Sequence, residues 1–153
     1  MRNTLSTIMV LIGLAGVVGC RDVKDPEFKR VEKFGVRKLN LDAATIGFNV
    51  TYFNPNSFGV TVKEAAVDVY LDTVYLGKFN QESEVGVSKN ADFSVPFSGQ
   101  IPLSMARKFN WQDFVKKDIL LKADGNVKVG KAGIFISKPI HYQGMHRLDE
   151  IKF

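Results

Sequence analysis

Apolar and polar residues alternate along most of the chain beyond residue 44, and this period of two is typical of β-strands. In the stretch TIGFNVTYFN, one face of the predicted strand carries Ile46, Phe48, Val50 and Tyr52. Thr51 falls on the opposite face, where truncation is expected to cost well under half as much stability as truncation of Phe48. Other strands are predicted in VDVYLD (67–72), ADFSVPF (91–97), DILLKAD (118–124), AGIFISKPIHY (132–142) and LDEIKF (148–153). Gly, Asn and Pro separate these runs at roughly the spacing of a β-sandwich.

One segment departs from this pattern. Good helix formers predict a short helix from about Leu103 to Val115, with Ser104 as a possible N-cap. The densest basic cluster of the chain lies on this segment or directly after it. Its residues are Arg107, Lys108, Lys116 and Lys117, and they accompany the aromatic side chains of Phe109, Trp111 and Phe114. The cluster could contact a headgroup surface or a protein groove, or the helix could simply pack its apolar side on the sheet.

The first nineteen residues hold one charge, Arg2, and an apolar run too short for a helix that crosses a bilayer. They predict a signal peptide. No A-x-A cleavage pattern follows, and Gly19-Cys20 stands in its place. This resembles the lipobox of bacterial lipoproteins, in which the cysteine carries diacylglycerol and becomes the mature amino terminus. The alternatives are a signal anchor with an incidental cysteine and a buried apolar amino terminus.

The lipoprotein interpretation gives Cys20 a physical role, because two or three acyl chains together anchor a protein durably to a membrane. It divides the chain into a signal peptide (1–19), a lipidated, solvated tether (20–33) and one β domain (34–153). The protein is then expected in the bacterial cell envelope, facing the periplasm or the cell exterior. Removing Arg2 with the signal peptide takes the formal net charge from +5 to 20 − 16 = +4.

The stretch NVTYFNPNSFGVTVKEAAVDVYLDTVYLGKF (49–79) resembles the type 2 late embryogenesis abundant family, also called the water stress and hypersensitive response domain. The shared features are the Asn54-Pro55-Asn56 turn, the strand 67–72 and the Leu76-Gly77 pair. DILLKADGNV and KAGIFISKPIHYQG resemble the closing strands of the family. The resemblance implies a single Greek-key β-sandwich, similar to fibronectin type III domains, with one short helix. It also implies a role in desiccation and stress tolerance.

The Asn54-Pro55-Asn56 motif also has an explanation in the residues themselves. Proline cannot donate to a sheet ladder, and asparagine side chains bond neighbouring backbone groups, so the motif is expected to end a strand and reverse the chain. The alternative is a surface that binds a ligand.

Candidate catalytic patterns are weak. GNVKVGKA fits the core of a phosphate-binding loop, but Ala132 replaces the magnesium-binding hydroxyl and a strand follows, which favours a hairpin. His141 and His146 are five residues apart, so a strand would send them to opposite faces. The carboxylate pairs Glu82/Glu84 and Asp68/Asp72 could serve as an acid and base or bind calcium, but a solvated sheet surface explains them as well.

These observations predict no enzyme, no metal site and no cofactor. The sequence pI of about 9.3 raises nucleic acid or anionic lipid as partners, but the lysines are dispersed and an exported lipoprotein seldom meets nucleic acid. We expect a membrane-anchored domain that binds or shields envelope proteins or lipids. Alternatives are an accessory subunit of a specific envelope assembly and, less favoured, a hydrolase with an undetected site. The oligomeric state and the ligand do not follow from the sequence.

Overall fold

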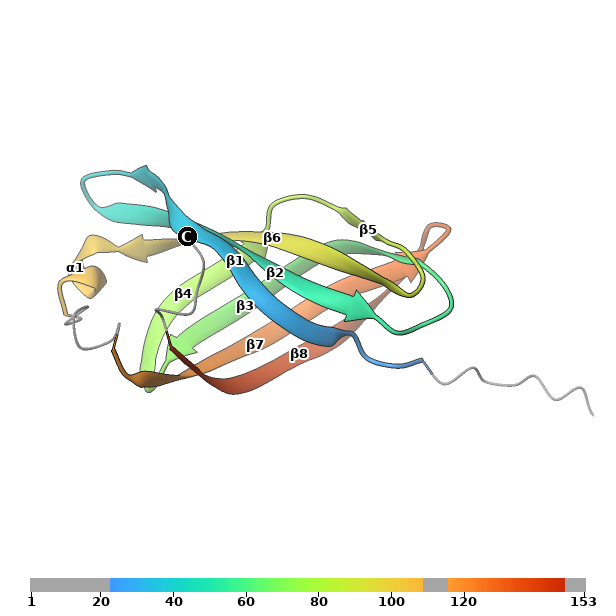
Figure 1. The fold of residues 1–153 in the computed structure, drawn as a ribbon. Coiled ribbons are helices and arrows are strands. Elements are labelled where there is room, and N and C mark those ends of the chain that lie inside the picture. The colour runs from blue at the N-terminus through green and yellow to red at the C-terminus, as the bar shows by residue number, and fades with distance from the viewer. Residues whose placement is uncertain (1–22, 109–115, 148–153) are drawn as a thin grey trace, which may run out of the picture.

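The computed structural model describes residues 23–108 and 116–147, and most of these lie in eight antiparallel strands (Figure 1). The strands are β1 (Glu27–Leu39), β2 (Ala43–Asn54), β3 (Val60–Leu71), β4 (Val74–Gln81), β5 (Val85–Val87), β6 (Ala91–Pro102), β7 (Asp118–Lys131) and β8 (Ile134–Arg147). A helix, α1 (Leu103–Ala106), follows β6. The predicted strand 148–153 lies outside the described residues.

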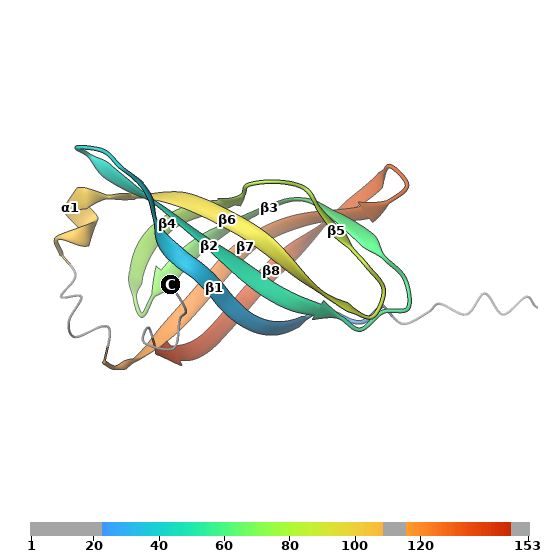
Figure 2. The same cartoon turned by 45° about the horizontal axis from the view of Figure 1, so that its top comes forward.

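All eight strands belong to one sheet in the order β1-β2-β6-β4-β3-β7-β8, and β5 pairs with the beginning of β3. The sheet curls so that β1, β2 and β6 lie opposite β3, β7 and β8, with β4 in the bend between them (Figures 1 and 2). The predicted mainly-β fold is confirmed, and its two layers are the halves of a single sheet. β4 joins them through partners on β3 and through the three pairs from Phe79↔Gly99 to Gln81↔Phe97 with β6.

The hydrophobic core lies between the two halves of the curled sheet. Its buried residues include Ala44, Ile46, Val50, Ala65, Val67, Val69, Leu71, Leu76, Phe79, Val95, Phe97, Ile101 and Ile119. Phe79 and Ile119 are the least exposed large side chains of the described residues. The period-two alternation of β3 is confirmed, because Val67, Val69 and Leu71 are buried while the residues between them are half-buried.

The predicted inner face of β2 is also confirmed, since Ile46 and Val50 are buried and Phe48 packs against the core. Thr51, on the opposite face of β2, is only 4% exposed. Its hydroxyl lies 3.0 Å from a carboxylate oxygen of Glu32 on β1 and 3.4 Å from the Ser94 hydroxyl on β6. Side chains of the neighbouring strands therefore cover this part of the outer face of β2.

Two predicted boundaries change. Strand β1 begins at Glu27, so the second half of the predicted tether (20–33) is part of the sheet and the domain starts before residue 34. The helix begins at Leu103 as predicted, but its N-cap is Pro102, without a side-chain cap bond, and Ser104 lies inside the helix. The remainder of the predicted helix includes residues 109–115, which lie outside the described residues.

The segment that resembled a phosphate loop forms the end of β7 and the turn to β8, as the hairpin interpretation predicted. Ala132 and Gly133 take φ values of 52° and 81°, which suits a two-residue hairpin turn. Gly125 allows close backbone approach, because a Cβ there would lie 1.9 Å from the Ala66 carbonyl oxygen. The glycines of this segment thus allow strand packing and a tight turn.

Within residues 23–108 and 116–147, no helix has the length and apolar character needed to span a bilayer.

Candidate functional site

An apolar cavity of about 410 Å³ opens between the two halves of the sheet. It lies where β4 has ended and no longer joins β3 to β6. Most of its lining is apolar and comes from β2, β3, β5, β6, β7 and β8 and from the connection between β2 and β3. These lining residues are Tyr52, Phe58, Val60, Val62, Ala65, Val87, Phe93, Val95, Phe97, Val127, Val129, Pro139, Ile140 and Tyr142. Its volume falls within the range of small-molecule sites.

Aromatic rings form one wall of the cavity. The Tyr52 and Phe93 rings stack with centroids 5.6 Å apart, and Phe28 lies edge-on to Tyr52 at 6.1 Å. Phe28 also lies 5.4 Å from Tyr142, which brings the edge strand β1 against the edge strand β8. Burial raises the pKa of the Tyr52 hydroxyl, and the nearby Tyr142 raises it further, so Tyr52 is neutral at physiological pH. The wall is therefore uncharged.

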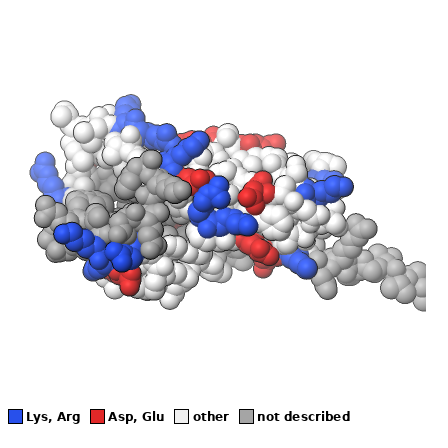
Figure 3. Space-filling model, in the orientation of Figure 1, with Lys and Arg blue, Asp and Glu red and all other residues white. Residues whose placement is uncertain are grey.

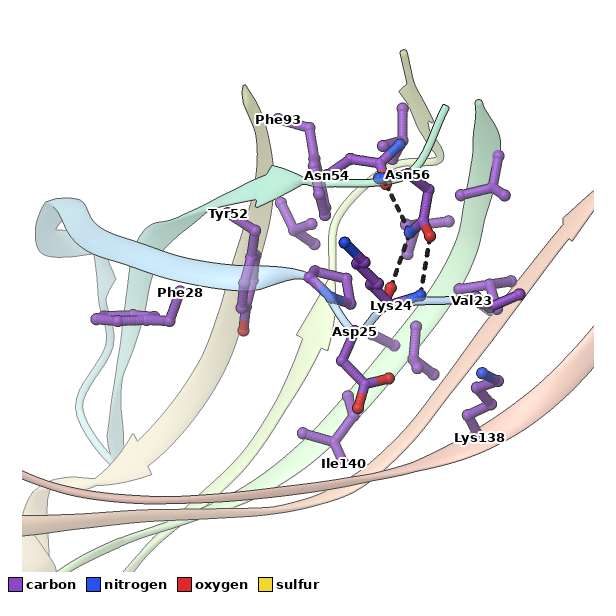
Figure 4. A pocket seen from close by; sticks show the side chains of 18 of the residues that line it. Val23, Lys24, Asp25, Phe28, Tyr52, Asn54, Asn56, Phe93, Lys138 and Ile140 are labelled. Atoms are coloured by element: carbon purple, nitrogen blue, oxygen red, sulfur yellow. Dashed lines mark hydrogen bonds between the residues drawn. The ribbon is translucent and has the colours of Figure 1, made fainter. Parts of the chain in front are cut away.

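The Asn54-Pro55-Asn56 motif closes one end of the cavity (Figure 4). Asn54 is buried, and its side-chain nitrogen donates to the carbonyls of Phe58 and Ser88 at 3.0 and 2.9 Å. Its side-chain oxygen accepts from the backbone and side-chain nitrogens of Asn56. The motif ends β2 as predicted. Since β2 and β3 are not neighbours in the sheet, it also carries the chain from one half to the other.

Asn56 holds the segment that precedes β1. Its side-chain nitrogen donates to the Lys24 carbonyl at 2.7 Å, and its side-chain oxygen accepts from the Lys24 backbone N–H at 2.9 Å. The amide therefore pairs with Lys24 as a strand partner would. We call Asn54, Asn56 and the Lys24 backbone the asparagine clamp. Besides ending β2, the motif therefore binds the amino-terminal segment of the domain.

Charged groups accompany the cavity near its opening. Lys24, Asp25 and Lys138 belong to its lining, and all three are exposed (Figure 4). The arrangement combines an apolar interior with two ammonium groups and one carboxylate at the surface. It suits a ligand with an apolar body and an anionic end.

The clamp defines one end of the molecule, which we call the motif end. The β7–β8 turn lies there too, because Thr61, near the start of β3, pairs with Gly130. The opposite end, the helix end, holds α1 and the β1–β2 turn (Figure 1). Strand β2 runs from one to the other, and its 12 residues span about 40 Å.

The predicted basic cluster lies at the helix end, away from the cavity. Arg107 and Lys108 are exposed at the end of α1, and Lys116 and Lys117 precede β7. Lys117 pairs with Asp72 at 3.3 Å. Trp111 lies outside the described residues, as does Cys20. Figure 3 shows basic side chains with acidic ones among them on this face of the molecule.

The other candidate groups are not brought together. His141 is exposed and its ring lies 2.8 Å from Asp124, whereas the His146 ring contacts the Tyr142 hydroxyl on the other face of β8. Asp68 accepts from the Tyr75 hydroxyl, while Asp72 accepts from the Leu120 backbone N–H.

The second carboxylate pair also differs from expectation. Glu82 and Glu84 lie in the connection between β4 and β5 and not on a strand. In the part of the chain that the structure describes, no group of His, Cys, Asp and Glu side chains could hold a metal ion.

Comparison with known protein families identifies the family of this chain. The sequence profile described as "Late embryogenesis abundant protein" matches residues 49–144, which is more than half of the chain. The chain belongs to this late embryogenesis abundant family. The predicted resemblance to its type 2 members is confirmed. The matched range of this chain includes both asparagines of the clamp.

The comparison with solved structures gives the following alignments. A protein from Archaeoglobus fulgidus, known from a crystal structure, aligns with a TM-score of 0.50 and 11% identity over 80% of this chain and 98% of its own. A protein from Arabidopsis thaliana, known from a solution structure, aligns with a TM-score of 0.47 and 16% identity over 84% of this chain and 82% of its own. No curated protein sequence matches significantly. The family is non-enzymatic, and the chain is a stress-related β domain within it.

The sequence did not reveal the cavity. Its lining residues come from parts of the chain that are far apart in the sequence, and most of them look like ordinary strand residues. The asparagine motif was the one local signal at this site, because two asparagines around a proline can satisfy several backbone groups at once.

Proposed function

We propose that the protein is a lipid-anchored, non-catalytic domain of the bacterial cell envelope that binds the acyl chain of a lipid in its cavity. The observation that carries this proposal is the cavity of about 410 Å³ with its aromatic and aliphatic lining. Each methylene moved from water into such a lining contributes about 0.8 kcal/mol. Several methylenes are thus enough for a stable complex.

The anchoring part of the proposal rests on Cys20 and on its closeness in the sequence to a residue that lines the cavity. Val23 lines the cavity and lies three residues after Cys20 in the sequence. Three extended residues span at most about 11 Å. An acylated Cys20 would hold the cavity close to the membrane, where lipids are available, and Lys24 and Lys138 would attract an anionic headgroup.

The non-catalytic part follows from the chemistry of the lining. The groups that line the cavity are mostly hydrocarbon and aromatic, and its two asparagines already use their side chains in the clamp. Binding a lipid in this way would shield it from water, which fits a domain of a stress-related family.

Binding of a fluorescent fatty acid to the purified protein tests the proposal. Val129 lines the cavity from β7, and Val129→Trp should fill the space and weaken saturable binding at least about tenfold, a loss of about 1.4 kcal/mol. Val74→Trp is the matched control, because Val74 packs against the core at the other end of β4 and does not line the cavity. Absence of saturable binding, or equal binding by both variants, would contradict the proposal.

The second candidate function is that of an accessory subunit in an envelope assembly. It is favoured by the exposed β1–β2 turn, where Leu41 is 95% exposed at the same end of the molecule as Arg107 and Lys108. A stoichiometric partner that crosslinks from position 41 and is lost on Leu41→Glu would support this function. Crosslinks to many proteins in substoichiometric amounts would speak against it.

A further inference from the structure

The β7–β8 turn presents an unusual apolar surface. Ile134 is 77% exposed and Ile136 is 55% exposed, although both are large aliphatic side chains. They do not lie in a flexible connection, because Lys131↔Ile134 and Val129↔Ile136 are register pairs of the β7–β8 ladder. The turn is therefore an ordered hairpin tip with apolar side chains in solvent.

This surface continues the lining of the cavity. The β7–β8 pairing runs without a register shift, so alternate residues of β8 stay on one face. Ile134 and Ile136 share that face with the cavity-lining Ile140 and Tyr142. Lys138 lies between Ile136 and Ile140 on the same face, so the apolar side chains of β8 lead from the hairpin tip to the cavity with one exposed lysine among them.

Basic side chains surround the hairpin tip. Lys131 is exposed beside it, and the ammonium group of Lys63 lies 4.9 Å from the centroid of the Phe135 ring. The nearby carboxylate of Glu64 is 3.6 Å from Lys128, which offsets its charge. Lysines thus lie on both faces of the hairpin beside its apolar side chains, a combination that matches the boundary between acyl chains and anionic headgroups.

The position of the β7–β8 turn favours a membrane as its binding partner. The turn and Val23 lie at the motif end, and Cys20 can lie no more than about 11 Å from Val23. The helix end also has exposed apolar side chains, Leu39 and Leu41, but they are about 40 Å away along β2. An anchor at Cys20 would bring the β7–β8 turn to the bilayer and leave Leu41 in water.

We propose that the β7–β8 turn inserts Ile134 and Ile136 into the anionic bilayer surface that holds Cys20, so that this face of β8, with Lys138 among its apolar side chains, leads from the membrane to the cavity. The proposal rests on the anchoring part of the proposed function. It goes beyond it by assigning the membrane-contacting residues and the orientation of the domain.

Site-directed fluorescence on the full-length acylated protein tests this orientation. The thioether blocks the thiol of Cys20, so Ile134→Cys and the matched control Leu41→Cys each carry one reactive thiol for an environment-sensitive dye. The labelled proteins are reconstituted in vesicles of phosphatidylcholine and phosphatidylglycerol that contain lipids with brominated acyl chains. We expect bromine to quench the dye at position 134 severalfold more than the dye at position 41. Lowering the phosphatidylglycerol fraction should reduce the difference.

Mass spectrometry of the same samples separates the possible failures. If Cys20 is acylated and the dye at position 134 is quenched no more than that at position 41, the orientation is wrong while the anchor stands. If Cys20 carries no lipid, the anchoring part of the proposed function fails and the orientation fails with it. Quenching of a dye on Ile136→Cys gives a second measurement of contact between the turn and the acyl chains. Quenching at position 41 alone would place the helix end on the membrane and overturn the proposal.

Discussion

The two ends of the molecule are held together in different ways. At the helix end β4 runs beside β3, and apolar side chains such as Leu71, Leu76 and Ile119 fill the space between the halves. At the motif end β4 has stopped, the halves separate around the cavity, and the buried amides of Asn54 and Asn56 connect the chain segments. One short strand thus decides where the sheet has a solid core and where it has room for a ligand.

Gln81, the last residue of β4, lies at the boundary between these two regions. Its side-chain nitrogen donates to the Val62 carbonyl of β3 at 3.0 Å and to the Ser83 carbonyl at 2.6 Å. Its side-chain oxygen is buried without a hydrogen-bond partner among the described residues. Where the backbone ladder between β4 and its neighbours ends, the Gln81 side chain therefore supplies the next hydrogen bond to β3.

The largest effect is expected from a cavity made at the helix end. Ile119 is 1% exposed, so Ile119→Ala should lower the free energy of unfolding by about 2–5 kcal/mol. The exposed Ile136 is the matched control, and Ile136→Ala should change stability by less than about 0.5 kcal/mol. Urea denaturation monitored by circular dichroism measures both. Equal losses would mean that the two ends do not differ as described.

Loss of the central amide of the motif end should rank second. Asn54→Ala leaves the Phe58 and Ser88 carbonyls and the Asn56 backbone N–H without this partner. Because these groups are partly or fully buried, the loss of unfolding free energy should be about 2–3 kcal/mol. Asn80→Ala, at an exposed position of β4, is the control and should be nearly neutral. A neutral Asn54→Ala variant in the same urea series would show that the amide network is not what stabilises the motif end.

A smaller and more local effect is expected from Asn56→Ala. This change removes both hydrogen bonds to Lys24 and should cost about 1–2 kcal/mol. Hydrogen exchange followed by NMR should show the Lys24 amide losing protection while amides in the middle of β3 keep theirs. If the Lys24 amide exchanges at an unchanged rate, the clamp does not hold the amino-terminal segment in solution.

The smallest effect concerns a charge at the helix end. A hydrogen bond from the Leu120 backbone N–H and the nearby Lys117 lower the pKa of Asp72 below its ordinary value of 3.8, against the opposing effect of desolvation. A lowered pKa stabilises the folded state above the unfolded-state pKa, and this contribution is lost as the pH falls through the folded-state pKa. Asp72→Asn should therefore reduce the fall in melting temperature between about pH 5 and about pH 2.

Thermal melts across this pH range check the expectation for Asp72. The effect should be small because the Asp72 side chain is 34% exposed and solvent screens its charge. A pH profile of Asp72→Asn that coincides with that of the unchanged protein would show that Asp72 does not contribute to acid sensitivity.

Local chemistry made much of the fold predictable. The alternation in β2 and β3 identifies the inner faces, because a strand of period two can bury only one set of side chains against a core. The Asn-Pro-Asn motif identifies the end of β2. The segment GNVKVGKA, which lacks the hydroxyl and the helix of a true phosphate-binding loop, identifies the hairpin of β7 and β8. The family resemblance follows from the same residues, because its features are mostly turns and core positions.

Tertiary structure decided the rest. The charged composition of residues 27–33 predicted a solvated tether, yet these residues form an edge strand, since pairing with β2 satisfies their backbone regardless of side-chain polarity. Burial of Thr51 depends on Glu32 and Ser94, which reach it from neighbouring strands.

The clamp between Asn56 and Lys24 joins residues 32 positions apart, and the cavity exists because β4 ends at Gln81 while β3 and β6 continue. Sequence patterns report which side of a strand is buried. They do not report what lies across from it, because that depends on contacts between segments distant in the chain.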